Sequence, residues 1–376
     1  MDISVQLYTG SCTKPAELDQ RGILHKLNRI LRRTDIKNAI IGWNKDVDLS
    51  EIVFFLKHKG VPLYLWLPVF SELDELSLFL PLIGLDNRKI EINFNMGNNE
   101  KFQFCCPANP ENIERIIGIY EKHYYKEIYD GVFLDKIRFP SFLGGMNSVS
   151  GCFCSYCRSN YSLPGKAELQ ITNSMYPFGI MSYNNLSYDL NDSYKKLFDY
   201  KCDAIFHSLE WLCKYFREKD LKIGFDLFAP FLAYFVGQDY FRLMSLADFV
   251  KPMFYSLTNA PAGLLFEVNM YAKAFDGSTE NARKRKELFL DCIDYGTDFV
   301  KKEIAGIRKI IENKGLKTRL YAGIEINYLE NIAPVTEGYI RESIAKIREA
   351  DGVVASWDLN TMSDNNIDCL LDAIGA

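Results

Sequence analysis

The chain has 376 residues, of which 48% are hydrophobic and 25% are charged, as in a water-soluble globular protein with one large domain or two ordinary ones. The net charge of −5 and the lack of a basic stripe exclude nucleic acid as an expected partner. No basic segment followed by an apolar run opens the sequence, and no stretch reaches the roughly 20 apolar residues of a membrane span, so we expect a cytoplasmic protein without a signal peptide or membrane contact.

Eight short apolar runs alternate with helix-like stretches along the chain. The runs cover residues 4–10, 38–44, 61–69, 130–139, 222–230, 248–255, 319–327 and 352–359. Helical periodicity marks residues 22–33, 50–60, 201–219, 299–315 and 338–350. Because the runs are mostly apolar rather than alternating, they are typical of strands covered on both faces. The pattern predicts an α/β fold, a (β/α)₈ TIM barrel, with residues 1–376 as a single domain.

The uneven spacing of the runs predicts loop insertions after strands three, four and six. Residues 89–107 indicate a small hairpin between strands three and four. Residues 141–195 form an insertion rich in Gly, Ser, Asn and Tyr that contains the sequence CFCSYC, and a third insertion covers residues 256–290. In this fold the loops that follow the strands form the active-site face.

Polar and aromatic side chains recur where the predicted strands end. They are Trp43 and Asn44 (strand two), Asp135 (four), Asp226 (five), Lys251 and Tyr255 (six), Glu325 and Asn327 (seven), and Trp357 and Asp358 (eight). Any one of them could be a helix cap or part of a structural ion pair, and Trp66 on strand three is expected in the core. Their recurrence at one end of one barrel is what indicates a site. The cations Lys136, Arg138 and Lys251 could balance the carboxylates and separate their pKa values, as acid–base chemistry requires.

Four segments carry a resemblance to a known group of proteins. The sequences DGVFLDKIRFPS, GFDLFAPFLAYFVGQDY, ADFVKPMFY and YAGIEIN resemble an uncharacterised group of bacterial glycoside-hydrolase-like (β/α)₈ TIM-barrel proteins, which carry LD-x-IR-[YF]-P on strand four and KPM-x-Y on strand six. The resemblance extends over most of the chain from strand four onward. It implies that Asp135 matches a strand-four nucleophile position and Glu325 a strand-seven catalytic position. The chain lacks the Asn-Glu pair typical of strand four in the largest clan, and it has Asp226 where amylases have a strand-five glutamate.

The sequence therefore favours a glycoside hydrolase with paired carboxylates at the C-terminal mouth of the barrel and a small carbohydrate or glycoside as its substrate. The expected catalytic residues are Asp135, Glu325 and Asp226. The expected substrate-binding residues are Arg138, Lys251, Tyr255, Trp43, Trp357 and Asp358. Two alternatives stay open: a class I aldolase or lyase that uses Lys251 as a Schiff-base amine, and a barrel that binds a glycan without cleaving it. The sugar, the linkage, the stereochemical outcome and the oligomeric state are left open.

Cysteines and histidines bear on metal chemistry. The four histidines all lie in helix-like stretches, which disfavours a histidine-rich metal centre. In a reducing compartment the ten cysteines are expected as thiols or metal ligands rather than disulfides. Cys152, Cys154 and Cys157 have the spacing C-x-C-x₂-C, and with Cys106 or Cys105 they predict a structural zinc site. The alternatives are packed cysteines or an adventitious disulfide, and no organic cofactor is expected.

Overall fold

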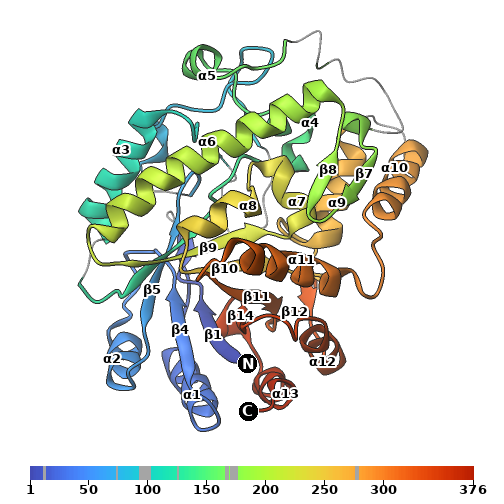
Figure 1. The fold of residues 1–376 in the computed structure, drawn as a ribbon. Coiled ribbons are helices and arrows are strands. Elements are labelled where there is room, and N and C mark those ends of the chain that lie inside the picture. The colour runs from blue at the N-terminus through green and yellow to red at the C-terminus, as the bar shows by residue number, and fades with distance from the viewer. Residues whose placement is uncertain are drawn as a thin grey trace.

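The computed structural model describes residues 1–11, 14–72, 75–92, 103–124, 127–165, 169, 177–275 and 279–376. Eight parallel strands form a closed barrel, which confirms the predicted TIM-barrel fold (Figure 1). In the order in which they neighbour one another, the strands are β1 (Asp2–Leu7), β4 (Ile36–Ile41), β5 (Leu63–Pro68), β6 (Gly131–Asp135), β9 (Lys222–Phe228), β10 (Phe249–Met253), β11 (Arg319–Glu325) and β14 (Gly352–Ser356). Strands three to eight of the sequence prediction are thus β5, β6, β9, β10, β11 and β14.

Each predicted apolar run overlaps one barrel strand, and six of the eight runs contain the whole strand. Strand residues are buried almost throughout, for example in β5 and β14, because helices cover the outside of the barrel while side chains fill its interior. In every adjacent pair the strands run parallel, and the register brings the carboxyl ends of all eight to the same end of the barrel.

Helices surround the barrel between successive strands. They are α1 (Gln20–Leu31), α2 (Ser50–His58), α3 (Pro110–Ile119), α6 (Asp192–Arg217), α11 (Phe299–Lys314), α12 (Glu337–Lys346) and α13 (Asp364–Ile374). Five of them begin after a residue whose side chain accepts a hydrogen bond from the first turn, namely Asp19, Asn109, Asn191, Thr336 and Ser363. Helix α13 packs against α12 and α1 and closes the ring, so the two termini lie side by side (Figure 1). Among the described helices none combines the length and the apolarity that crossing a membrane requires.

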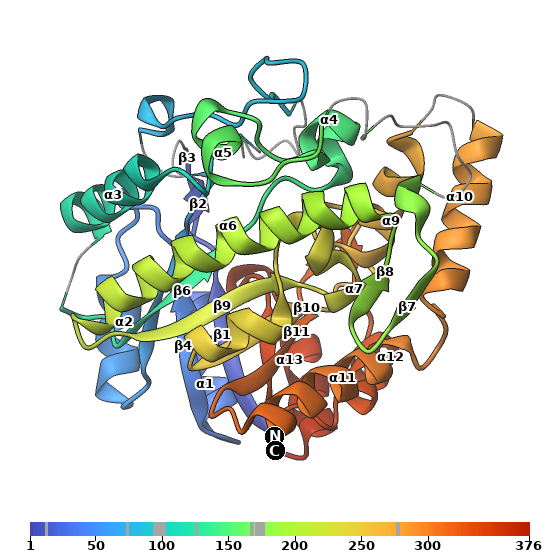
Figure 2. The same cartoon turned by 45° about the horizontal axis from the view of Figure 1, so that its top comes forward.

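Long connections follow β5, β6 and β10. Of the predicted hairpin, residues 93–102 lie outside the described part. After β6 come α4 (Gly145–Val149), α5 (Ser155–Asn160) and the antiparallel pair β7 (Ser182–Asn184) and β8 (Ser187–Asp189). After β10 come α9 (Leu264–Lys273) and α10 (Thr279–Cys292). Figure 2 shows α4 and α5 together above the barrel, with α9 and α10 beside them.

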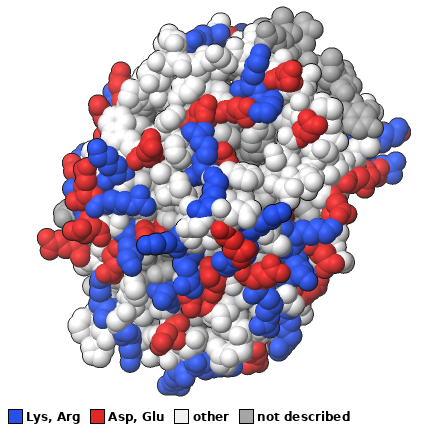
Figure 3. Space-filling model, in the orientation of Figure 1, with Lys and Arg blue, Asp and Glu red and all other residues white. Residues whose placement is uncertain are grey.

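The other connections are shorter. Helices α7 (Pro230–Ala233) and α8 (Tyr240–Leu243) join β9 to β10. Two small antiparallel pairs complete the described elements, β2 (Gly10–Ser11) with β3 (Lys14–Pro15) and β12 (Tyr328–Leu329) with β13 (Ala333–Pro334). On the face shown in Figure 3, Lys and Arg side chains are interspersed with Asp and Glu, so neither sign forms a separate patch there.

Candidate active site

A pocket of about 160 Å³ lies at the carboxyl ends of the strands, where the sequence predicted a site. It is lined by Tyr8, Trp43, Trp66, Asp135, Lys136, Arg138, Asp226, Phe228, Met253, Tyr255, Thr258, Ala260, Pro261, Ala262 and Trp357. The lining includes two of the three predicted catalytic residues and four of the six predicted substrate-binding residues. Lys251, Glu325 and Asp358 are not part of the lining, but Lys251 donates a hydrogen bond to Asp226, which is.

Asp135 is the last residue of β6, and its carboxylate is held by two donors. The indole Nε1 of Trp66 donates to Oδ2 at 2.9 Å, and the backbone N–H of Lys136 donates to Oδ1 at 2.5 Å. Lys136 has a φ of 51°, so the chain turns sharply directly after the carboxylate. These two hydrogen bonds orient the carboxylate and stabilise its negative charge.

Asp226 lies on β9 in register with Lys251 on β10. The Lys251 ammonium donates to Oδ2 of Asp226 at 2.9 Å and to Oε1 of Gln6 at 3.1 Å. Both members of the pair are buried, whereas Oδ1 of Asp226 has no hydrogen-bond partner among the described residues. Burial raises the pKa of Asp226 to about 7; Lys251 opposes this rise and the negative charge of Asp135 adds to it.

The two aspartates occupy the same level of adjacent strands. The last residue pair between β6 and β9 is Leu134 with Phe225, so Asp135 and Asp226 stand one position further along. Neighbouring strands lie about 4.8 Å apart, and both carboxyl groups face the pocket. The site therefore combines a hydrogen-bonded carboxylate with a carboxyl group that keeps its proton up to about pH 7.

Aromatic rings form two walls of the pocket. On one side Tyr8, Trp43 and Trp66 pack edge to face, with ring centroids 5.6–6.1 Å apart. On the other side the rings of Tyr255 and Trp357 lie 5.8 Å apart. Rings of this kind offer flat, weakly polar surfaces, and a few polar groups at the base can orient a ligand between them.

Arg138 supplies a positive charge in the wall of the pocket. Its guanidinium lies between the rings of Phe104 and Phe228, 4.9 and 4.5 Å from their centroids, and Nη1 donates to the carbonyl oxygen of Phe139 at 3.1 Å. The side chain is only 5% exposed. This packing fixes the charge in a place where Arg138 lowers the pKa of Asp226.

Glu325 does not line the pocket, and its carboxyl group accepts hydrogen bonds from a loop and from a helix. Its Oε1 accepts hydrogen bonds from the backbone of Leu257 at 2.7 Å and of Thr258 at 3.3 Å, and its Oε2 accepts one from the Tyr339 hydroxyl at 2.7 Å. Burial raises the pKa of Glu325 to about 7. The carboxyl group thus supports the loop after β10, which contributes Thr258 to the pocket.

Asp358 has a similar supporting position. Its Oδ1 accepts hydrogen bonds from the backbone of Tyr8 at 3.3 Å and of Asn360 at 3.1 Å, and burial raises its pKa to about 6. The sequence analysis missed Tyr8 and Gln6 and assigned Trp66 to the core. Tyr8 directly follows the first strand, so the same strand-end rule could have found it.

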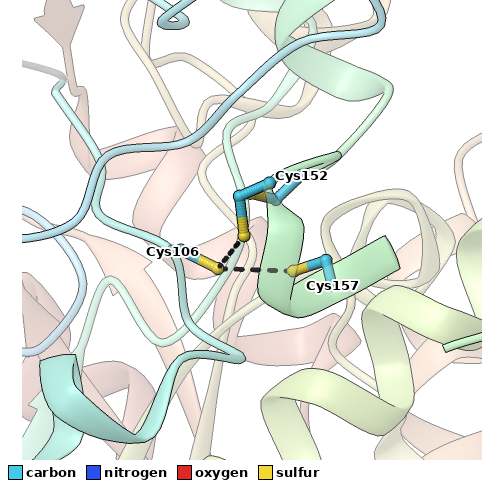
Figure 4. A group of neighbouring side chains, drawn as sticks. Cys106, Cys152 and Cys157 are labelled. Atoms are coloured by element: carbon cyan, nitrogen blue, oxygen red, sulfur yellow. Dashed lines mark hydrogen bonds between the residues drawn. The ribbon is translucent and has the colours of Figure 1, made fainter. Parts of the chain in front are cut away.

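Four cysteines form a separate cluster above the barrel. The sulfur atoms of Cys106, Cys152, Cys154 and Cys157 all lie within 4.8 Å of one another. Cys106 Sγ is 3.5 Å from Cys157 Sγ and 3.9 Å from Cys154 Sγ, and Figure 4 shows three of the thiols pointing toward one another. Such a group could hold a metal ion. Cys105 is not part of it, and none of the cysteines of the described residues forms a disulfide.

Comparisons with known proteins place the fold among (β/α)₈ barrels. Neither a protein-family model nor a curated protein matches the chain. The PgaB (BpsB) glycoside hydrolase domain from Bordetella bronchiseptica is similar in structure, with a TM-score of 0.59 at 14% identity over 99% of this chain and 98% of that one. The β-galactosidase from the psychrophilic Marinomonas ef1 has a TM-score of 0.54 at 10% identity over 100% of this chain and 59% of that one. The α-L-fucosidase isoenzyme 2 from Paenibacillus thiaminolyticus has a TM-score of 0.52 at 10% identity over 99% of this chain and 48% of that one. At these identities the likeness establishes the barrel fold alone.

Proposed function

We propose that this protein is a glycoside hydrolase in which Asp135 and Asp226 act as the paired carboxyl groups. The observation that carries the proposal is the placement of two carboxyl groups at one level of adjacent barrel strands, at the base of an aromatic pocket and in different electrostatic environments. Glycoside cleavage requires one carboxyl group that donates a proton to the leaving oxygen and one carboxylate that acts at the anomeric centre. Two carboxyl groups whose environments separate their proton affinities suit these roles.

Asp226 is assigned as the proton donor. Its raised pKa keeps it protonated up to about pH 7, and Oδ1 has no other partner among the described residues. Asp135 is assigned as the carboxylate that acts at the anomeric carbon, because hydrogen bonds from Trp66 and from the backbone of Lys136 fix the positions of its two oxygens. Glu325 is the alternative second carboxyl group from the sequence analysis, but its two oxygens already accept three hydrogen bonds.

The substrate class follows from the size and walls of the pocket. A volume of about 160 Å³ between aromatic rings suits a small, flat, polyhydroxylated ring such as a single sugar unit. The three similar structures are described as a glycoside hydrolase domain, a β-galactosidase and an α-L-fucosidase, which supports a carbohydrate substrate. The geometry does not favour a Schiff-base aldolase, because Lys251 is fully buried, is bonded to Asp226 and Gln6, and is not part of the pocket lining.

The proposal is tested by screening the protein against a panel of nitrophenyl glycosides and then assaying variants on the best substrate. Asp135→Asn should lose turnover on this substrate, and Asp226→Asn should lose turnover on the methyl glycoside of the same sugar, whose leaving group needs a proton. Glu303→Gln is a matched control, because Glu303 on α11 is a buried carboxyl group outside the pocket. Full activity of both aspartate variants would refute the assignment. Sugar binding by calorimetry without hydrolysis of any glycoside would instead identify a glycan-binding barrel.

We further propose that the cysteine cluster holds a structural zinc ion. Zinc–sulfur bonds of about 2.3 Å in a tetrahedron separate the sulfurs by about 3.8 Å, close to the observed 3.5 and 3.9 Å. Four cysteines leave no open coordination position, which is typical of a structural site. Elemental analysis of protein purified without chelator should give about one zinc per chain. The Cys157→Ser variant should lose it and the control Cys213→Ser should keep it; a metal-free wild-type protein would contradict the proposal.

A further inference from the structure

Asp226, Lys251 and Gln6 form a polar group inside the barrel. Asp226 and Lys251 are a register pair on β9 and β10, and Gln6 comes from β1. The Lys251 ammonium lies 2.9 Å from Oδ2 of Asp226 and 3.1 Å from Oε1 of Gln6. The lysine side chain is 0% exposed, so a ligand in the pocket meets Asp226 and not Lys251.

Neighbouring residues leave Lys251 little room to move. A Cβ atom at Gly323 on β11 would lie 2.5 Å from Cε of Lys251 and 3.2 Å from its Cγ, so any larger residue there would displace the lysine. The rings of Phe133 and Tyr255 lie 5.6 and 5.2 Å from its ammonium. The charge is therefore confined beside one oxygen of Asp226.

We propose that Lys251 is a positioning residue, which holds Oδ2 of Asp226, leaves Oδ1 without a partner among the described residues, and sets how readily Asp226 gives up its proton. This inference rests on the proposed function, in which Asp226 is the proton donor. It assigns the strand-six lysine a role other than that of a Schiff-base amine.

The electrostatics of Asp226 support this role. The charged and titratable groups facing it are Asp135, Arg138, Lys251, Tyr240 of α8 and Tyr255. Burial raises the pKa of both tyrosines well above its ordinary value, so they stay neutral. Of the charged groups, Lys251 has the largest effect and lowers the pKa of Asp226. An acid works best when its pKa lies near the working pH, and the lysine offsets part of the rise that burial causes.

The test compares Lys251→Met with Lys201→Met. Lys201 is also fully buried, but it donates to backbone carbonyl oxygens, among them that of Val149 at 2.8 Å, and it does not line the pocket. Each variant is labelled with [γ-¹³C]aspartate and titrated by NMR, with the Asp226 signal assigned from Asp226→Asn. The pH profile of kcat/KM is measured on the same samples.

We expect Lys251→Met to raise the pKa of Asp226 by about 1 to 3 and to move the alkaline limb of the pH profile upward by the same amount. Lys201→Met should change neither the pKa of Asp226 nor the alkaline limb. Gly323→Ala displaces the Lys251 ammonium without removing it, so the pKa of Asp226 and the alkaline limb should both shift in the same direction as in Lys251→Met. Gly338→Ala, where a Cβ meets no atom within 4 Å, is its control.

The outcomes separate the inference from the proposed function. An Asp226 signal that titrates alike in wild type and Lys251→Met overturns the inference, whatever the activity. A shifted Asp226 signal with an unchanged pH profile, or with no glycosidase activity in the wild type, supports the role of Lys251 but removes Asp226 as the proton donor. If the Asp226 signal and the pH profile shift together, the result supports both the role of Lys251 and the role of Asp226 as the proton donor.

Discussion

Replacing Asp226 with Asn should remove activity on glycosides with unactivated leaving groups and at the same time make the protein less sensitive to alkali. In the unfolded chain Asp226 releases its proton near its ordinary pKa of 3.8, whereas in the folded protein it does so at about 7. Between these values the folded state binds one more proton than the unfolded state, so stability falls as the pH rises. The difference of about 3 in pKa corresponds to about 4 kcal/mol of unfolding free energy.

The Asn variant lacks this contribution. Below pH 7 the wild-type Lys251 already faces a neutral carboxyl group, and the Asn side chain offers an oxygen in its place, so the substitution itself should cost little there. The free energy of unfolding of Asp226→Asn, relative to that of the wild type, should therefore rise by about 4 kcal/mol between pH 4 and pH 7. All other titrating groups are shared by the two proteins and cancel in the comparison.

Urea unfolding followed by tryptophan fluorescence at a series of pH values measures this difference. Two variants serve as controls, because the direction in which each should change the pH dependence of stability is known. Burial raises the pKa of Glu303 to about 8, so Glu303→Gln should gain relative stability in the same direction. A hydrogen bond from Arg29 lowers the pKa of Asp368, so Asp368→Asn should lose relative stability as the pH rises. Parallel curves for the wild type and Asp226→Asn between pH 4 and pH 7 would refute the reasoning.

Three further predictions follow from the same structure. Asp135→Asn should fold normally and lose about 10²- to 10⁴-fold in turnover, checked by circular dichroism and steady-state kinetics; wild-type turnover would contradict its role. Glu325→Gln should keep its turnover, whereas Asp226→Ala should retain activity only on glycosides with activated leaving groups and be rescued by azide; the reverse pattern would make Glu325 the acid. Stripping metal with a chelator should lower the melting temperature of wild type and of Cys213→Ser but not that of Cys157→Ser, and equal melting curves before and after chelation would contradict a structural metal.

The sequence predicts the barrel well because burial on both faces makes each strand an apolar run. It also predicts that Asp135, Asp226 and Tyr255 lie toward the carboxyl ends of their strands, where all three line one pocket. It could not predict which groups each side chain contacts. Glu325 occupies the expected level, yet its Oε1 accepts a hydrogen bond from the backbone of Leu257, 68 residues earlier in the chain, and its Oε2 accepts one from the Tyr339 hydroxyl.

Trp66 is buried in the core, as the apolar run predicts, but it also makes a contact that the run does not predict. It lies two residues before the end of β5. Pro68 of β5 pairs with Asp135 of β6, and the long indole reaches the carboxylate from one strand away. The pairing of strands and the length of a side chain together determine this contact, and a single sequence contains neither the register nor the stagger of a closed barrel.

Three ionisable groups of the pocket are each held by residues from another part of the chain. Trp66 donates a hydrogen bond to Asp135, Lys251 donates one to Asp226, and the rings of Phe104 and Phe228 pack against Arg138. Phe104 lies two residues before Cys106, whose sulfur joins the long connection after β5 to the start of α5 in the connection after β6. A metal ion at the cysteines would close both connections at one point and reduce the freedom of loops that have little regular structure. Such an ion would also restrain the segment that carries Phe104, one of the two rings against the Arg138 guanidinium.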